Sequence, residues 1–345
     1  GKLIGVNNNT YNNYFGLNLI NCQYENLTIS SKYASGGFAG FVDCGANVLI
    51  SSVKNTTDQA QVIGNSSVIT TTDTSVGYAG GVFGYLKTNL EINGAGDSED
   101  CQDVVLKDVS VSAKSYAGGY VGQFENYGNT NTYKMISAVF KKGTVNADGN
   151  IGGLLGNSES RVTNSISQCR VENTQLNKEN GSRQTGGLIG RLNSSGQLNI
   201  TGCTVKSVTE YGAYSGGLIG EVVGTVTAAD TKVTGTESDK TNLYSTNGAS
   251  GIYGRLSTDK LLTVERCEIS NTLIDTSTWS ASAFNGDILY SIGQRAKTAV
   301  YDSSAEHVEI KAPYSGGFAG QARGTMTASN LEINDVKITG KNSNN

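Results

Sequence analysis

The heptapeptide YSGGLIG at residues 214–220 has two close copies, YAGGYVG at residues 116–122 and YSGGFAG at residues 314–320. Its central part, two glycines followed by two apolar residues and a third glycine, begins seven times in clean form, at Gly36, Gly80, Gly118, Gly152, Gly186, Gly216 and Gly316. A copy at Ser250 lacks only the first glycine, and degraded copies begin at Gly1 and Leu289. Self-similarity at spacings of 27 to 44 residues predicts a repeat architecture in which each turn is supported by its neighbours.

The residues that follow the glycine pair alternate in the way that is typical of a β-strand. In GGLIGRL at residues 186–192, Leu188, Gly190 and Leu192 fall on one face. Ile189 and Arg191 fall on the other face. We assign the first face to the core, and we expect a large side chain from another strand of the same turn to cover the third glycine.

A second predicted strand begins at a cysteine in several turns, as in CRVENT at residues 169–174 and CTVKSV at residues 203–208. Cys169, Cys203 and Cys267 each lie 17 residues after the start of their repeat. Residues in the same register of a solenoid stack at about the 4.8 Å spacing of paired strands. We predict that these three cysteines face inward as packing residues and bind no metal, because the chain has no CxxC pair and one histidine.

Together these patterns predict an all-β fold, a parallel β-solenoid of about ten turns that forms a single repeat domain over residues 1–345. Crossovers between parallel strands are almost always right-handed, so we expect a right-handed β-helix. We interpret the chain as a segment of a longer surface protein.

Composition excludes several classes of function. The net charge is −4 and charged residues make up 16 % of the chain, whereas a nucleic-acid-binding protein would present a basic face. No run of about 18 apolar residues occurs, so no insertion into a membrane is expected in this segment. No cofactor-binding motif is present, and we predict no catalytic residue and no metal site.

The letters GGLLG and GGLIG, each followed by a polar stretch and then by a strand such as NSISQCRV, resemble the GLUG motif. That motif occurs in tandem in bacterial surface adhesins and in the non-catalytic regions of immunoglobulin A peptidases. The resemblance covers the chain from residue 1 to about residue 340, and it implies a secreted, surface-attached repeat protein without an active site. The HExxH zinc motif of the peptidase relatives is absent, because His307 is the only histidine.

We therefore expect a non-catalytic extracellular segment, the stalk or shaft of a cell-surface adhesin. Its partner would be a protein or carbohydrate ligand, or a second copy of the chain. Two alternatives remain open. One is a carbohydrate-active β-helix enzyme, for which Asp275, Asp287 and Arg295 are candidate residues. The other is a subunit of a surface filament in which solenoid ends stack on one another.

Two sets of residues are candidates for binding. Tyrosines two residues before the glycine pair either face a sugar or form a structural stack at the corner: Tyr78, Tyr116, Tyr214 and Tyr314. Alternation places a row of apolar residues on the outer face, where they would form a lateral contact surface: Leu155, Ile189, Ile219 and Tyr253. His307 is expected to be a surface residue, and the acidic group Asp97, Glu99 and Asp100 is expected to be a solvated loop.

Overall fold

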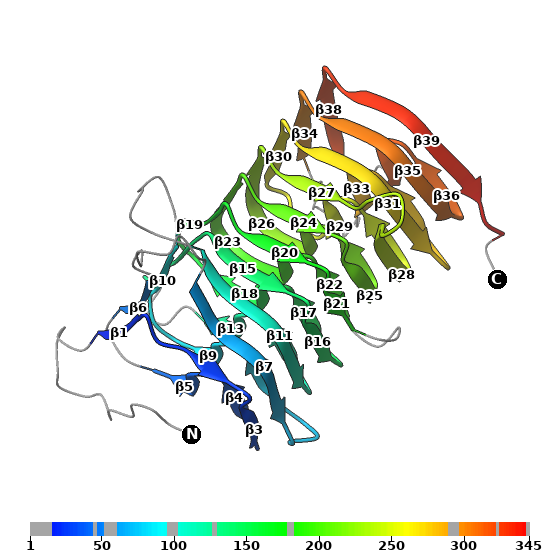
Figure 1. Ribbon diagram of the computed structural model, residues 1–345. Coiled ribbons are helices and arrows are strands. Elements are labelled where there is room, and N and C mark those ends of the chain that lie inside the picture. The colour runs from blue at the N-terminus through cyan, green and yellow to red at the C-terminus, as the bar shows by residue number, and fades with distance from the viewer. Residues whose placement is uncertain are drawn as a thin grey trace.

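The computed structural model describes residues 16–43, 47–51, 61–94, 103–125, 130–177, 183–288, 297–321 and 324–342, without the side chains of 194–195 and 286–288. These residues form a parallel β-solenoid, as predicted (Figure 1). Successive turns stack along one axis, from β4 (Ala34–Gly36) to β39 (Glu332–Gly340). The described residues contain no helix that is long and apolar enough to cross a membrane.

One sheet receives two stretches of strand from each turn. The first stretch follows the glycine pair, in β5 (Ala39–Val42), β9 (Phe83–Leu86), β13 (Val121–Glu125), β18 (Leu155–Ser160), β23 (Ile189–Thr201), β26 (Ile219–Ala229), β29 (Tyr253–Leu256), β33 (Asn285–Ile288) and β37 (Ala319–Gln321). The second stretch is the later part of β23 and of β26, and elsewhere β1 (Leu17–Ile20), β6 (Val48–Ser51), β10 (Leu90–Asn93), β14 (Tyr133–Ile136), β19 (Asn164–Ser167), β30 (Leu261–Glu265), β34 (Lys297–Tyr301) and β38 (Thr325–Ser329).

The other sheet carries the strands that follow the cysteine position and the short strands that lead into the glycine pair. The former are β2 (Tyr24–Glu25), β3 (Thr28–Ser31), β7 (Gln61–Thr71), β11 (Val104–Ala113), β15 (Ala138–Lys141), β16 (Thr144–Ala147), β20 (Arg170–Glu172), β21 (Gln175–Leu176), β24 (Thr204–Lys206), β25 (Thr209–Gly216), β27 (Lys232–Thr234), β28 (Thr241–Ser250), β31 (Glu268–Thr276), β35 (Ser304–Ala312) and β39. The latter are β4, β8 (Tyr78–Gly80), β12 (Tyr116–Gly118), β17 (Asn150–Gly152), β22 (Gln184–Gly186), β32 (Ser280–Ser282), β36 (Tyr314–Gly316) and the ends of β25 and β28.

The first glycine of each clean repeat stacks on its counterparts, which confirms the predicted register. The stack runs through Gly36, Gly80, Gly118, Gly152, Gly186, Gly216, Ser250, Ser282 and Gly316. The predicted start at Leu289 is therefore wrong, because the corner of that turn lies at Ser282. Serine and alanine replace the glycine pair there, so a search for Gly-Gly does not find it. The predicted start at Gly1 lies outside the described residues.

Backbone crowding explains why glycine occupies the corner positions. A Cβ on the second glycine, Gly187, would lie 2.2 Å from the carbonyl oxygen of Gly217 and 2.7 Å from Val205. A Cβ on the third glycine, Gly190, would lie 2.6 Å from the backbone nitrogen and oxygen of Ile151 in the preceding turn. Real Cβ atoms do not approach other atoms so closely. The expectation that a large side chain covers the third glycine is therefore wrong, because that glycine meets backbone. A side chain of the same turn covers the second glycine instead.

Left-handed residues set two further corners in most turns. One set immediately precedes the cysteine position: Asn21, Ser137, Gln168, Gly202, Asp230, Arg266, Asp302 and Asn330. The other lies five residues later: Asn26, Ser66, Asp108, Lys142, Asn173, Ser207, Asn271, His307 and Asp335. Asn and Asp tolerate positive φ better than other residues with a side chain, and they make up half of the first set and five of the nine residues of the second. The turns they produce enclose one continuous hydrophobic core.

Candidate binding groove

The lateral contact surface that alternation predicts is wrong. Its four residues are each 0 % exposed and belong to the hydrophobic core: Leu155, Ile189, Ile219 and Tyr253. The chain bends at the glycine pair, because the N–H groups of Leu188 and Ile189 both donate to the carbonyl of Leu218, at 3.0 Å each. In a straight strand successive side chains point to opposite faces. The bend breaks that alternation, and Leu188 and Ile189 are both buried.

Two columns of residues follow the glycine corner along the solenoid, and we call the surface along them, with the pocket in its middle, the corner groove. The residue two places before the first glycine supplies one column: Tyr78, Tyr116, Asn150, Gln184, Tyr214, Gly248, Ser280 and Tyr314. The residue after the third glycine supplies the other: Phe41, Tyr85, Gln123, Asn157, Arg191, Glu221, Arg255, Asp287 and Gln321. The columns meet, since Asn150 Nδ2 donates a hydrogen bond to Asn157 Oδ1 at 3.0 Å.

The N-terminal part of the corner groove is aromatic. The ring of Tyr85 stacks on Phe41 with centroids 5.1 Å apart, and it contacts Tyr78 of the other column at 4.9 Å. Tyr78 in turn lies 5.7 Å from Tyr116 in the next turn. Burial raises the pKa of Tyr78, and the neighbouring Tyr116 raises it further. Tyr85 is buried, whereas Phe41, Tyr78 and Tyr116 are half-buried, so these three rings give the surface an aromatic edge of the kind that can contact sugars.

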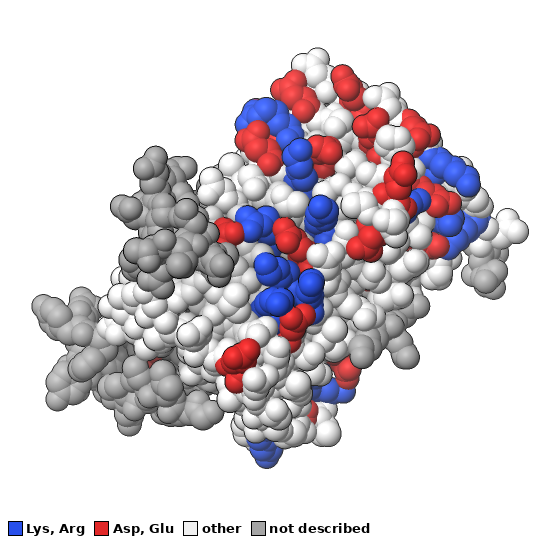
Figure 2. Space-filling view, in the orientation of Figure 1, with Lys and Arg blue, Asp and Glu red and all other residues white. Residues whose placement is uncertain are grey.

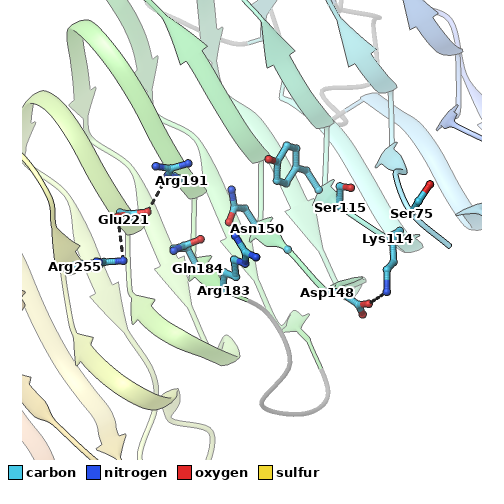
Figure 3. Close-up of a pocket in the computed structure, with 12 residues that line it drawn as sticks. Ser75, Lys114, Ser115, Asp148, Asn150, Arg183, Gln184, Arg191, Glu221 and Arg255 are labelled. Atoms are coloured by element: carbon cyan, nitrogen blue, oxygen red, sulfur yellow. Dashed lines mark hydrogen bonds and ion pairs between the residues drawn. The ribbon is translucent and has the colours of Figure 1, made fainter. Parts of the chain in front are cut away.

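The middle of the corner groove contains a pocket of about 580 Å³ (Figure 3). Amide side chains form part of its wall, and Asn150 and Gln184 are only 3 % and 7 % exposed. Asn157 Nδ2 donates to Gln123 Oε1 at 2.8 Å, so the amides continue the groove toward the aromatic part. At the far side of the pocket, Lys114 and Asp148 form an ion pair.

Glu221 joins two arginines at the other end of the pocket (Figure 3). Its Oε2 lies 2.8 Å from Arg191 Nε, and its Oε1 lies 3.4 Å from Arg255 Nη1. Ser257 also donates a hydrogen bond to Oε1, at 2.8 Å. The Arg255 guanidinium lies 4.6 Å above the ring of Tyr214, which places a cation over an aromatic face. One carboxylate therefore fixes two guanidinium groups from the turns on either side of it.

The C-terminal part of the corner groove is aromatic again. Trp279 Nε1 donates to Gln321 Oε1 at 2.6 Å, and the indole ring lies 6.3 Å from Tyr314. Both rings are open to solvent, with 41 % and 53 % of Trp279 and Tyr314 exposed. An exposed Trp held in place by its N–H can offer a flat apolar face to a ligand.

The predicted tyrosines share one column, as the sequence indicates, but they do not form one stack. Only Tyr78 and Tyr116 contact each other. Asn150 and Gln184 separate Tyr116 from Tyr214, and two further turns separate Tyr214 from Tyr314. Whether these rings face a sugar stays a prediction.

The two described acidic residues of the candidate enzyme site lie in different sheets. Asp275 lies on β31 in an ion pair with Lys341, whereas Asp287 lies on β33 in the other sheet. Arg295 and the acidic group at Asp97, Glu99 and Asp100 lie outside the described residues. His307 is exposed, as predicted, and its Nε2 is 3.4 Å from the carboxylate of Asp335. Its φ of 52° makes it a corner residue.

The three register cysteines face inward, as predicted, with Cys169 and Cys203 at 0 % and Cys267 at 1 % exposure. Each thiol donates to the carbonyl two residues earlier, as Cys169 does to Ser167 at 3.3 Å. In the turns without cysteine, the hydroxyls of Thr231 and Ser303 make the same bond, at 2.9 and 2.7 Å. The residue at this position therefore closes the left-handed corner that precedes it.

Comparisons with family models, with curated proteins and with solved structures found no match to this chain. The GLUG resemblance therefore stays a prediction. The sequence did contain one signal for the pocket, because the residue after the third glycine is polar in successive turns, at Asn157, Arg191, Glu221 and Arg255. That it faces the tyrosine column across the corner is visible only in the structure.

Proposed function

We propose that this chain is a non-catalytic structural and adhesive repeat segment of an extracellular surface protein, and that the corner groove is its binding face. The observation that carries the proposal is the groove itself, with aromatic rings at both ends and amides and arginines between them. The groove follows the stack of corners, so it can contact an extended ligand over several turns. The solenoid supplies a rigid support, since each strand pairs with those of the turns above and below.

Binding of the purified chain to immobilised matrix proteins, mucin and glycans tests this proposal. Trp279→Ala removes an exposed ring of the groove, and we expect it to weaken adhesion at least about tenfold, as loss of a central aromatic anchor does. Tyr301→Ala is the matched control, because Tyr301 lies at the end of β34, in the column of Glu265 and Ser329, away from the glycine corner. Equal losses in both variants, or none in Trp279→Ala, would contradict the assignment of the groove.

A carbohydrate-active enzyme is the second candidate, and one observation favours it. Glu125 and Glu159 are register neighbours on β13 and β18, at the edge of the aromatic part of the groove. Burial raises the pKa of Glu125, and the charge of Glu159 raises it further. Glycoside hydrolysis uses two carboxyl groups, one of which has a raised pKa and serves as the general acid. Release of reducing sugar from a polysaccharide by the chain, and its loss in Glu125→Gln, would establish this candidate in place of the first.

A further inference from the structure

The pocket in the middle of the corner groove carries more positive than negative charge, although the chain as a whole has a net charge of −4. Four cationic side chains line it, those of Lys114, Arg183, Arg191 and Arg255. The two carboxylates that line it belong to Asp148 and Glu221. The local excess of two positive charges makes this stretch of the groove suited to an anion.

The distribution of the ion pairs shows which cations remain available. Lys114 is paired with Asp148, and the two oxygens of Glu221 are shared between Arg191 and Arg255. No described carboxylate lies within ion-pair distance of Arg183, which is exposed at the rim. A guanidinium has five N–H donors in a planar fork that matches a carboxylate, so these three arginines retain donors for a ligand.

Gln184 supplies a second sign that a polar ligand belongs here. It lies on β22, is 7 % exposed and lines the pocket between Arg183 and the Arg191–Glu221 pair (Figure 3). No hydrogen bond joins its side-chain amide to another described residue, whereas Asn150 in the preceding turn bonds to Asn157. The amide of Gln184 lines the pocket and is therefore available to bond a ligand hydroxyl, since it has both donor and acceptor groups.

The rings beside the pocket identify the class of ligand. Tyr116 lines the pocket on one side, and Tyr214 lies under Arg255 on the other. Apolar ring faces pack against the CH groups of a sugar, amides bond its hydroxyls and guanidinium groups bind a carboxylate. We infer that this pocket, which we call the arginine pocket, holds the carboxylate of an acidic sugar residue in a glycan that lies along the corner groove. The inference rests on the proposed function, because it names the ligand of that groove.

A panel of immobilised oligosaccharides that carry uronate or sialate residues, each beside its carboxyl-reduced counterpart, tests the inference with the purified chain. We expect binding to acidic members that falls at least about tenfold on reduction of the carboxyl group, the loss of one charge-assisted hydrogen bond or more. Binding should also weaken with added salt, because the charges lie in a groove open to solvent.

Variants locate the site. Arg183→Gln removes a guanidinium that makes no ion pair with the described residues, so the fold should be unaffected while binding of the acidic glycan falls about tenfold. Arg191→Gln should weaken binding as well, but it also deprives Glu221 of a partner, so its melting temperature must be measured alongside. Lys206→Gln is the control, because it removes the same charge from an exposed residue at the end of β24 that does not line the pocket.

The outcomes separate the inference from the proposed function. Selective binding of acidic glycans that Arg183→Gln weakens and Lys206→Gln does not would support both. Equal binding of acidic and reduced glycans that Trp279→Ala abolishes would overturn the inference and leave the groove as the binding face. Equal effects of Arg183→Gln and Lys206→Gln would overturn the inference as non-specific charge attraction. Failure to bind any acidic glycan at millimolar ligand, or equal affinity for polyglutamate, would also overturn it.

Discussion

Ile189 shows how one bend in the backbone decides which side chains are buried. It is 0 % exposed and stacks between Leu155 and Ile219 in the core. We expect Ile189→Lys to lower the free energy of unfolding by more than about 3 kcal/mol, because a charge would be buried without a partner. Urea unfolding measures this loss. The control Gln197→Lys, on an exposed position of the same strand, should change stability by less than about 0.5 kcal/mol. An unchanged midpoint for Ile189→Lys would mean that its side chain faces solvent.

Glu210 is the one carboxylate in an inward column of aliphatic residues, between Leu176 and Leu243. It is 0 % exposed, and neither carboxylate oxygen has a hydrogen-bond partner. Burial raises the pKa of Glu210 well above its usual value. Below the unfolded pKa of about 4.3 both states are protonated and the residue costs nothing through ionisation. As the pH rises above that value only the unfolded chain loses the proton, so stability falls.

We therefore expect Glu210→Leu to stabilise the solenoid, and to do so more at neutral pH than at pH 4, where only the cost of the unpaired neutral carboxyl group is removed. The difference from the natural sequence should grow by up to about 1.4 kcal/mol per pH unit above the unfolded pKa, until Glu210 ionises in the folded state. Denaturant unfolding between pH 4 and pH 8 measures it. Glu237→Gln, in an exposed loop, is the control and should show no such slope. A constant difference across this range would show that Glu210 has an ordinary pKa.

At the level of the strand, the residue at the cysteine position donates a hydrogen bond to the carbonyl two residues earlier. This bond is present in each described turn that has a buried thiol or hydroxyl at that position. Burial raises the pKa of Cys169, with Cys203 beside it, and raises the pKa of Cys267 to about 11. At pH 8 Cys267 should thus have about one hundredth of the thiolate of an ordinary cysteine, since two pKa units are a factor of about a hundred.

We expect iodoacetamide to label the partly exposed Cys22 quickly and the three buried thiols only on unfolding. Peptide mapping by mass spectrometry distinguishes them, and fast labelling of Cys203 in the native protein would contradict the inward register.

The elements that the sequence predicts well are those whose signal is repeated. Glycine pairs and cysteines fix the register of Gly152, Gly186 and Cys203, because each turn obeys the same steric limits. Alternation cannot predict a bend inside the motif. Two consecutive apolar residues occur both at a bend, where both point inward, and in a straight strand that is buried on both faces. The sequence pattern also does not reveal a glycine that replaces a large residue in the core. Gly64 occupies an inward position where its neighbours are large, and the ring of Tyr24 from the preceding turn fills the space.

The candidate site was harder to predict than the fold, for a geometric reason. Arg191 and Gln184 are seven residues apart, but they lie on the two sides of one corner. Their proximity depends on the angle of the bend at Gly186 and Gly187, which no local pattern encodes. Arg255 lies still farther along the chain and reaches Glu221 only because turns stack in register.

The described turns form a one-dimensional stack, and most of their charged side chains lie on its surface. Figure 2 shows Lys and Arg in a line across the middle of one face, with Asp and Glu next to them. Pairs such as Lys232 with Glu268, at 2.8 Å, join adjacent turns, but exposed pairs of this kind contribute little to stability. Cohesion along the axis therefore comes from strand pairing and from the core.

In such a stack a local defect should weaken the neighbouring turns more than distant ones. Gly190 is the place to introduce one, because an added Cβ would lie 2.6 Å from the backbone of Ile151 and 2.5 Å from the carbonyl oxygen of Gly156. We expect Gly190→Ala to cost about 3 kcal/mol, the upper end for overpacking, because rigid backbone cannot yield as a flexible side chain does. Gly202→Asn is the control, since Gly202 has a φ of 63° and an added Cβ would come no closer than 3.7 Å to a neighbour, and Asn21 and Asn330 occupy the same corner elsewhere.

Native-state hydrogen exchange in Gly190→Ala then reports how far the defect spreads. Amides of β17, β18, β22, β23 and β26 should exchange faster than in the natural sequence, because these strands belong to the altered turn or pair with it. Amides of β11 and of β31 and β35 lie in turns beyond that contact and should keep their protection, as nearest-neighbour coupling requires. In Gly202→Asn all of these strands should exchange as in the natural sequence. Uniform acceleration of every strand in Gly190→Ala would show instead that the solenoid opens only as a single cooperative unit, and that its stability is not a sum over turns.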